Sequence, residues 1–168
     1  MTVLNYPASS LMNAEVMPLL GSYFFNELIS MVRVSKVFVY AVQYQWKWNV
    51  HERFSKVQML GSEIIKAQAR GVDVRVILNQ ESPNRNLSKI NGVTCDALAR
   101  SGCSVRLLRT PSLLHTKLWI IDGVCSFVGS HNISGRSLSV NEEFSVKVMS
   151  KRFALFSKQY FETLWSSR

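Results

Sequence analysis

The chain has 168 residues, of which 47% are hydrophobic and 18% are charged, a balance typical of a globular protein and not of a disordered one. Its 20 Lys and Arg residues exceed its 11 Asp and Glu residues, so the formal net charge is +9. This excess favours polyanions such as nucleic acid or anionic lipid surfaces as partners. The alternative is a basic surface that only keeps the protein in solution.

Three cysteines occur without a CxxC pair, which is typical of thiols that pack as small hydrophobic groups in a reducing compartment. Cys95, Cys103 and Cys125 therefore predict no zinc site. The first twenty residues include Glu15 and lack a basic segment followed by an unbroken apolar run, so we expect no signal peptide. No run reaches the roughly 18 apolar residues that a membrane span needs. These features predict a cytoplasmic protein without a membrane span.

No repeat or Pro/Gly-rich linker divides the chain, so residues 1–168 are predicted to form one domain, with residues 1–20 as an irregular N-terminal extension. In the first half, apolar residues at three- and four-residue steps predict helices, and alternating or continuous apolar runs predict strands. In chain order we predict a helix at residues 22–34, a strand at 36–48, a helix at 52–70, a strand at 72–78, a helix at 87–101 and a strand at 103–108.

The strands of the second half are predicted to be antiparallel, because Asp122 and Gly123 form a strong hairpin-turn signal between two apolar runs. We predict strands at residues 116–122 and 124–130, a helical turn after Ser134, a strand at 142–149 and a helix at 152–165. Five residues of this last helix form an apolar stripe that should face the core: Phe153, Phe156, Tyr160, Leu164 and Trp165. An alternating front half and an antiparallel back half together predict an α/β sandwich with a mixed central sheet.

His115 and Lys117 interrupt the apolar run that begins the first predicted hairpin strand. Side chains alternate across a strand, so both project from the same face. A lysine supplies positive charge for an anion, and an imidazole serves as nucleophile, acid or base near neutral pH. Taken alone, an HxK pair is also compatible with two surface residues on an edge strand.

The residues that follow have a definite spacing. Four residues separate Lys117 from Asp122, six more lead to Gly129 and Ser130, and Asn132 and Glu143 come after them. In this pattern the sequence resembles the phospholipase D superfamily, whose signature is HxK, four residues, Asp, six residues, Gly-Ser and a nearby Asn. The resemblance extends over residues 23–165, and the length is similar to that of the small endonucleases that carry one motif per chain.

The resemblance implies a phospholipase D-like α/β/α fold and a phosphodiesterase that uses no metal and no other cofactor. It assigns His115 as the nucleophile that forms a covalent phosphohistidine, and Lys117 and Asn132 as phosphate ligands. Glu143 matches an acidic position whose carboxylate would hold the imidazole N–H of His115. It assigns Ser130, in the Gly129-Ser130 pair, and Asp122 to supporting roles, with Asp122 as a structural partner at the turn.

The motif occurs once in the sequence. When a phosphodiester bond breaks, the oxygen of the leaving group needs a proton, and a second catalytic histidine would be required to donate it. A covalent nucleophile does not easily serve as the acid in its own first step, and neither His51 nor His131 is followed by a lysine at the right spacing. We therefore predict a homodimer, in which a twofold axis brings a second His115 into the site. His51, in a polar segment, is predicted to lie on the surface or to begin a helix.

Several residues are candidates for substrate binding. Between Asp96 and Asp122 the chain holds no acidic residue, and this stretch contains Arg100, Arg106, Arg109 and Lys117, which suit a polynucleotide backbone or a solvated helix face. Phe38, Tyr40 and Val42 are predicted to form a buried strand face, whereas Tyr44 and Trp46 either stack on bases or pack in a core or interface. His131 is expected to pack, with substrate contact as the alternative.

The first functional hypothesis is therefore a metal-independent endonuclease acting on DNA, and on RNA as a further substrate. A phospholipid phosphodiesterase of the cardiolipin type is the second, because the same chemistry permits it. The third is a nucleic-acid-binding subunit with a vestigial site. The sequence leaves open DNA versus RNA, strandedness, sequence specificity and biological pathway.

Overall fold

A computed structural model describes residues 9–49, 52, 54–81 and 85–167, so the prediction for His51 lies outside the described residues. It contains four helices: α1 (Ser22–Val34), α2 (Lys56–Ala69), α3 (Asn86–Arg100) and α4 (Lys151–Ser166). Seven strands accompany them: β1 (Glu15–Leu20), β2 (Phe38–Gln43), β3 (Asp73–Asn79), β4 (Ser104–Leu108), β5 (Lys117–Ile121), β6 (Cys125–Gly129) and β7 (Phe144–Met149).

The strands form one mixed sheet in the order β1-β7-β6-β5-β2-β3-β4. β2, β3 and β4 are parallel, as expected for strands joined by helices, and β5, β6, β7 and β1 are each antiparallel to a neighbour. The two halves meet where β5 pairs antiparallel with β2.

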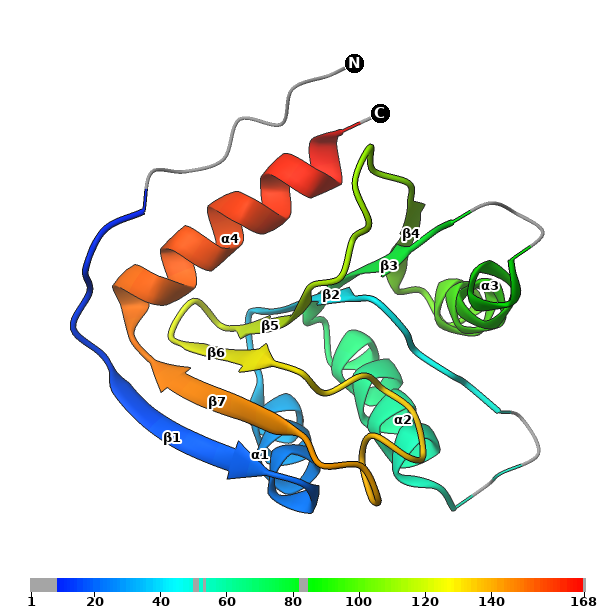
Figure 1. The fold of residues 1–168 in the computed structure, drawn as a ribbon, viewed down its shortest axis with the longest axis horizontal. Helices are drawn as coiled ribbons and strands as arrows, with labels where there is room; N and C mark the ends of the chain where they lie inside the picture. Colours follow the sequence, from blue (N-terminus) through cyan, green and yellow to red (C-terminus); the bar gives the residue numbers. More distant parts are fainter. Residues whose placement is uncertain (1–8, 50–51, 53, 82–84, 168) are drawn as a thin grey trace.

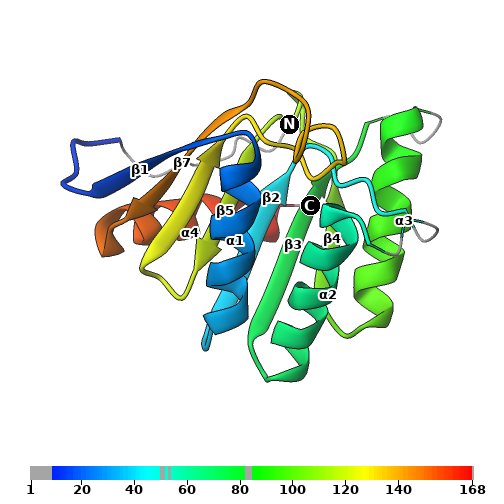
Figure 2. The ribbon, with the colours of Figure 1, turned by 90° about the horizontal axis from the view of Figure 1, so that it is seen from below.

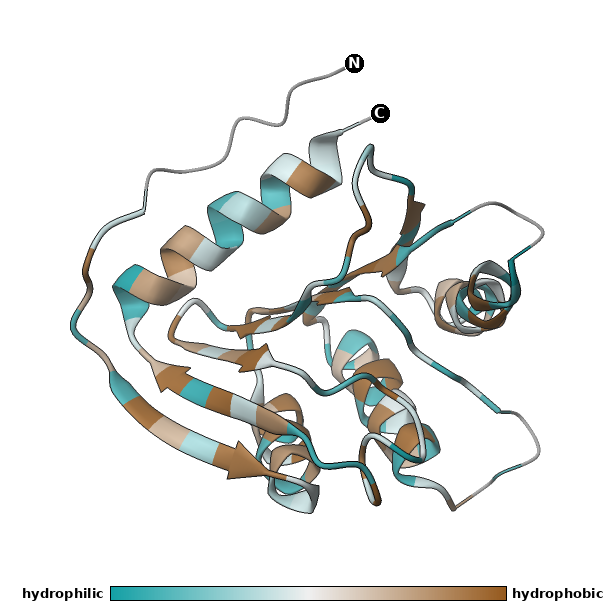
Figure 3. Cartoon of the chain, in the orientation of Figure 1, coloured by the Kyte–Doolittle hydropathy of each residue, from teal (hydrophilic) through white to brown (hydrophobic). Residues whose placement is uncertain are grey.

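Helices cover both faces of the sheet. Figures 1 and 2 show α1, α2 and α3 on one face and α4 on the other, and Figure 3 shows hydrophobic residues along the strands and on one side of the helices. Each face has its own apolar core because alternate strand residues point in opposite directions: Val39 and Trp119 pack on the first face, and Tyr40 and Ile120 on the second. The predicted α/β/α sandwich with a mixed sheet is confirmed. No helix in the described part of the chain is long and apolar enough to cross a membrane.

Three local predictions need correction. The predicted irregular extension contains a strand, β1, because residues 15–20 pair along the whole of β7. The predicted strand 36–48 stops at Gln43, where the chain leaves the sheet. On α4, the buried side is Ala154, Ser157, Phe161 and Leu164, whereas the other predicted stripe residues are half-buried at its margins.

Asp122 fixes the β5–β6 turn to the start of β2. Asp122 and Gly123 have φ values of 52° and 68°, the left-handed conformation that a tight hairpin turn requires. The Asp122 carboxylate accepts backbone N–H bonds from Lys36, Val37 and Phe38 at 2.9, 2.8 and 3.0 Å. Because β5 spans five residues, this carboxylate lies about 17 Å from Lys117. Its contacts are structural.

His131 links α1 to β7. Its ring is fully buried and stacks on Phe24 at 4.3 Å between centroids. Nε2 lies 3.0 Å from the carbonyl oxygen of Gly21, which can only accept, so Nε2 carries the proton. Nδ1 then accepts from the Ser145 hydroxyl at 2.7 Å. Burial holds the pKa of His131 below its ordinary value, so the folded protein favours the neutral ring.

We predict that Asp122→Ala lowers the free energy of unfolding by about 1.5–3 kcal/mol, because three N–H groups lose a charged acceptor. Asp122→Asn should lose less, since its amide oxygen still accepts and asparagine tolerates positive φ. Urea unfolding of the two variants measures the difference. Wild-type stability in Asp122→Ala would show that the carboxylate has no such role.

The lowered pKa of His131 predicts a loss of stability in mild acid. Above pH 6.5 the ring is neutral in the folded and unfolded states, and below it the unfolded chain takes up the proton first. The free energy of unfolding should therefore fall as pH drops from 6.5 toward the lower folded pKa. Urea unfolding between pH 5 and 7.5 should show a shallower fall in His131→Gln than in the wild type. Equal slopes would contradict the prediction.

Candidate active site

The candidate site lies at one edge of the sheet. Parallel strands β2, β3 and β4 end at this edge, and β5 begins there because it runs antiparallel to β2. β6 ends and β7 begins at the same edge. β1 also ends here, because Leu20 pairs with Phe144 at the start of β7. All seven described strands therefore have an end at this edge, at the upper end of the sheet in Figure 2.

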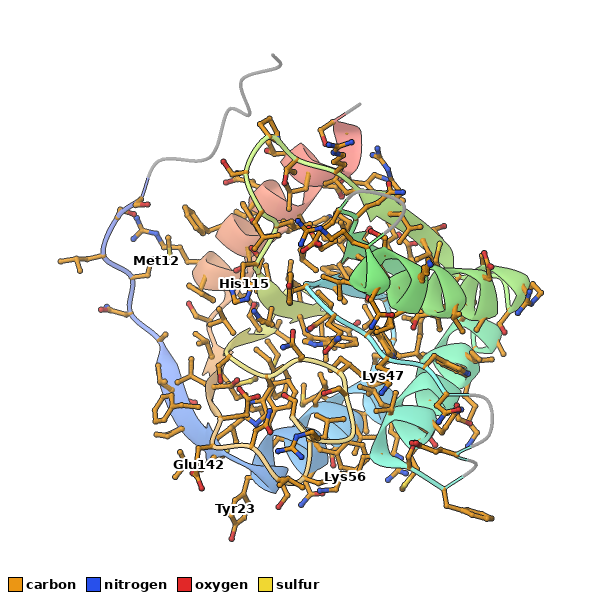
Figure 4. The ribbon with its side chains drawn as sticks, turned by 45° about the vertical axis from the view of Figure 1, so that its right-hand side comes forward. Met12, Tyr23, Lys47, Lys56, His115 and Glu142 are labelled. Atoms are coloured by element: carbon orange, nitrogen blue, oxygen red, sulfur yellow. The ribbon has the colours of Figure 1, made fainter. Side chains whose placement is uncertain are left out.

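His115 and Lys117 are in direct contact. The Lys117 Nζ lies 3.0 and 3.1 Å from the two ring nitrogens of His115 and donates to the His115 carbonyl oxygen at 2.8 Å. Tyr44, at the end of β2, packs against both: its ring centroid is 4.5 Å from that of His115 and 5.0 Å from Nζ. The His115 side chain is exposed, whereas Lys117 is only 7% exposed. Figure 4 shows His115 at this edge. The imidazole is accessible to a substrate, and the ammonium lies beneath it.

The pKa values of both members of this pair are lowered. Partial desolvation of the ring by the surrounding protein, followed by the charge of Lys117, lowers the pKa of His115 below its ordinary value. Burial also lowers the pKa of Lys117, and the charge of Glu143 opposes that shift. A neutral imidazole has a free lone pair, which is what a nucleophile or a base needs.

Gly129 allows β6 to lie close to the start of β7 beside the site. Continuing the β5–β6 register by one residue sets Gly129 opposite Lys117. A Cβ at Gly129 would lie 2.4 Å from the Cα of Ser145 and 2.5 Å from the carbonyl oxygen of Phe144, so only glycine fits between β6 and β7. The following residue, Ser130, donates its N–H to that same carbonyl at 3.0 Å. The Gly-Ser pair is thereby fixed one strand away from Lys117.

Glu143 is held by hydroxyl and amide groups. Its carboxylate accepts hydrogen bonds from Ser130, from Ser137 at 2.8 Å and from Asn141 at 3.3 Å. Burial alone would raise the pKa of Glu143, but these hydrogen bonds outweigh it and keep the pKa below its ordinary value. Within the described residues no hydrogen bond joins Glu143 to His115, so the predicted carboxylate–imidazole contact is not found in one chain. The charge of Glu143 does act on the HxK pair, because it acts to raise the pKa of Lys117.

Asn132 is connected to the Glu143 network through its backbone. Its backbone N–H donates to Ser137 Oγ at 2.9 Å, which connects it to the Glu143 network. The next residue, Ile133, donates to the Gln45 carbonyl at 3.0 Å, which ties the loop to the end of β2. The Asn132 Oδ1 is buried without a hydrogen-bond partner in the described chain. That atom is therefore without a competing contact among the described residues.

Gln43 was not predicted from the sequence. It is 0% exposed, and both polar atoms of its side chain lack a partner among the described residues. It pairs directly with Lys117 across β2 and β5 and shares its face of the sheet. Unsatisfied buried amides are rare and costly, which favours a role at the site for this one. A glutamine ending an apolar strand was the only signal, and its meaning depends on knowing the strand pairing.

Three of the predicted substrate-binding residues do not face the site. Arg106 donates to the carbonyl groups of Trp165 and Ser167 and so fixes the end of α4. Trp46 is 0% exposed and packs in the core against Trp119. His131 is buried against α1 as described above.

The other two predicted substrate-binding residues lie at the site edge. Tyr44 contacts His115, and Arg109 follows the end of β4. The basic stretch is not continuous in space, since Arg100 precedes β4 and lies at the opposite edge of the sheet.

The arrangement suits reaction at a phosphate. It offers an accessible imidazole with a lowered pKa, the Lys117 amine beneath it and the buried amide of Gln43 paired with Lys117, which match a nucleophile and donors for the oxygens of a phosphoryl group. Among the described residues, no three His, Cys, Asp or Glu side chains gather as metal ligands.

Comparison with known proteins identifies the family to which the chain belongs. The sequence profile described as "Cardiolipin synthase, PLD-like domain" matches residues 35–165. The 5'-3' exonuclease PLD3 of Xenopus tropicalis is 31% identical over 113 residues, which make up 64% of this chain and 22% of that protein. This chain thus spans less than a quarter of that relative's length.

Solved structures share the fold. The phospholipase D family member Nuc from Salmonella typhimurium superimposes with a TM-score of 0.74 at 19% identity, over 91% of this chain and 95% of that chain. NucT from Helicobacter pylori gives a TM-score of 0.72 at 21% identity, over 92% and 98% of the two chains. The matched profile covers most of the sequence, and the chain belongs to the PLD-like domain family of the phospholipase D superfamily.

Proposed function

We propose that the protein is a metal-independent phosphodiesterase that cleaves nucleic acid, DNA first and RNA as a further substrate, through a covalent phosphohistidine. The observation that carries this proposal is the contact between the exposed imidazole of His115 and the buried ammonium of Lys117 at the strand-end edge. The net charge of +9 favours a polyanionic substrate. PLD3, a 5'-3' exonuclease, is among the similar proteins.

The chemistry follows from the side chains present. Neutral His115 attacks phosphorus and forms the N–P bond while the P–O bond to the leaving group breaks. Lys117 and the amide N–H of Asn132 stabilise the charge that develops on the phosphoryl oxygens. Water then attacks the phosphohistidine and releases the product and the imidazole. A proton donor for the leaving oxygen contributes about 10²–10⁴ in rate, and this chain offers no second HxK pair to provide it.

A second copy of the chain supplies that donor in the proposed enzyme. The rim beside the site carries exposed apolar side chains that a partner would cover: Leu20, Tyr23, Val140 and Phe144, which are 58%, 69%, 66% and 56% exposed. Leu20 and Phe144 are paired across β1 and β7, and the Gly21 N–H donates to the Glu143 carbonyl. Figure 4 shows Tyr23 and Glu142 at this rim. Burying this rim in a twofold interface brings two copies of the site together.

We expect the wild-type protein to cleave plasmid DNA or single-stranded DNA in excess EDTA, because Lys117 and Asn132 take the place of a metal ion. His115→Ala should lose at least 10³-fold in rate, since it removes the group that forms the covalent intermediate. Gel assays with DNA, RNA and phospholipid vesicles measure both effects. A strict need for Mg²⁺ would contradict the mechanism, and turnover of lipid alone would favour the phospholipid phosphodiesterase.

We also expect the chain to form a dimer whose dissociation reduces activity. Val140→Asp places a charge in the apolar rim and should shift sedimentation toward the monomer, with a parallel loss of specific activity. Leu11→Asp, at a 97% exposed position, is the matched control. A fully active monomer at all concentrations would rule out the shared site.

A further inference from the structure

A cavity lies at the same strand-end edge, on the β3–β4 side of His115. It has a volume of about 340 Å³ and is bordered by the ends of β3 and β4 and by the segment that leads from β4 to β5. Asn79, Glu81, Arg85, Arg109, Pro111 and Leu113 are among its lining residues. Its size is within the range of small-ligand sites. The proposed chemistry at His115 uses none of these residues.

Asn79 gives the cavity a polar wall. The residue is 1% exposed, and its Nδ2 has no hydrogen-bond partner in the described chain. Its backbone carbonyl is already satisfied by Asn91 Nδ2 at 2.8 Å, so only the side-chain amide is left over. A buried amide without a partner is expensive unless a ligand completes it. Every nucleobase presents acceptors on its edge that this amide can bind.

Arg109 gives the cavity a free positive charge. Glu81 pairs with Arg85 at 3.9 Å, which leaves the acid of the cavity neutralised. Arg109 is exposed and forms no hydrogen bond or ion pair with the part of the chain that the structure describes. An arginine without an acidic partner suits a phosphate, because its guanidinium donates two parallel hydrogen bonds.

The cavity is rigidly connected to the nucleophile. Its outer wall, residues 109–113, continues directly into Leu114 and His115. Leu114 is 5% exposed and packs in the core beneath α4, which anchors this segment. Leu113 and His115 are two residues apart, so their Cα atoms are separated by about 7 Å at most. A chain molecule bound at His115 therefore reaches the cavity with its neighbouring unit.

We propose that this cavity binds the nucleotide next to the scissile phosphate of a single-stranded nucleic acid, with the base against Asn79, Pro111 and Leu113 and a flanking phosphate on Arg109. This rests on the proposed nucleic-acid substrate and adds strandedness to it. A base enters such a cavity only when it has left its stack, which costs least in a single strand. The polar wall and the free arginine do not suit an acyl chain.

Binding of a fluorescent hexadeoxyadenylate to His115→Ala tests the proposal without cleavage. Adding Arg109→Gln should raise Kd about tenfold, because a charge-assisted hydrogen bond is lost. Arg100→Gln is the matched control, since it removes the same charge from an exposed arginine at the opposite edge of the sheet, and it should change Kd less than twofold. A duplex of the same length should bind more weakly. Its Kd should change little, and by the same factor, in Arg109→Gln and in Arg100→Gln.

Asn79→Leu provides an independent variant. Replacing an unpartnered buried amide by an apolar group of similar size should keep or raise the urea midpoint, whereas Kd for the hexadeoxyadenylate should rise several-fold. Unchanged affinity in Asn79→Leu, equal losses in Arg100→Gln and Arg109→Gln, or equal binding of single strand and duplex would overturn the cavity assignment.

Cleavage assays with two substrates test the cavity assignment and the proposed function separately. In the chain with His115 intact, Arg109→Gln should lower kcat/KM for the oligonucleotide about tenfold and leave turnover of bis(4-nitrophenyl) phosphate within twofold, because the small diester does not reach the cavity. Equal losses on both substrates would overturn the cavity assignment. Oligonucleotide binding as predicted without any His115-dependent cleavage would overturn the proposed function and support the cavity.

Discussion

The antiparallel pairing of β5 with β2 is the constraint on which the site depends. β2, β3 and β4 run in parallel, so their carboxyl ends share an edge of the sheet. Because β5 runs the other way, its first residues meet that edge, and Lys117 pairs with Gln43. A parallel β5 would place His115 and Lys117 at the far edge, among the starts of β2, β3 and β4. The chemistry therefore depends on the direction of one central strand.

Most of the elements were predictable, since apolar periodicity and turn residues are local signals. The helix at residues 22–34 and the hairpin at Asp122-Gly123 lie where the pattern placed them. β1 was missed because its residues are largely exposed on an edge strand, which removes the alternation that marks a half-buried one. The stripe on α4 was displaced because small residues, Ala154 and Ser157, face the sheet where large ones were expected.

The candidate site was predictable where the residues lie on a strand, and less so in loops. The two-residue period places His115 and Lys117 on one face without knowledge of the fold. The partners of Glu143 depend on how the loop between β6 and β7 brings Ser130, Ser137 and Asn141 to its carboxylate, and no periodic pattern encodes that path. Arg106 and Arg109 are close in sequence, yet one fixes the end of α4 and the other lines a cavity. Spacing identified the motif, and tertiary contacts decided what its neighbours do.

The electrostatics of His115 raise a question that the proposed dimer must answer. Two identical copies have identical lowered pKa values, yet one imidazole must be neutral to attack and the other charged to protonate the leaving oxygen. Lys117 favours the neutral form in both copies. A bound phosphodiester carries a negative charge, which raises the pKa of any imidazole beside it. In the proposed dimer, a substrate between the two rings would have its phosphorus toward one and its leaving oxygen toward the other. In the proposed dimer it is therefore the substrate that assigns the two histidines their different roles.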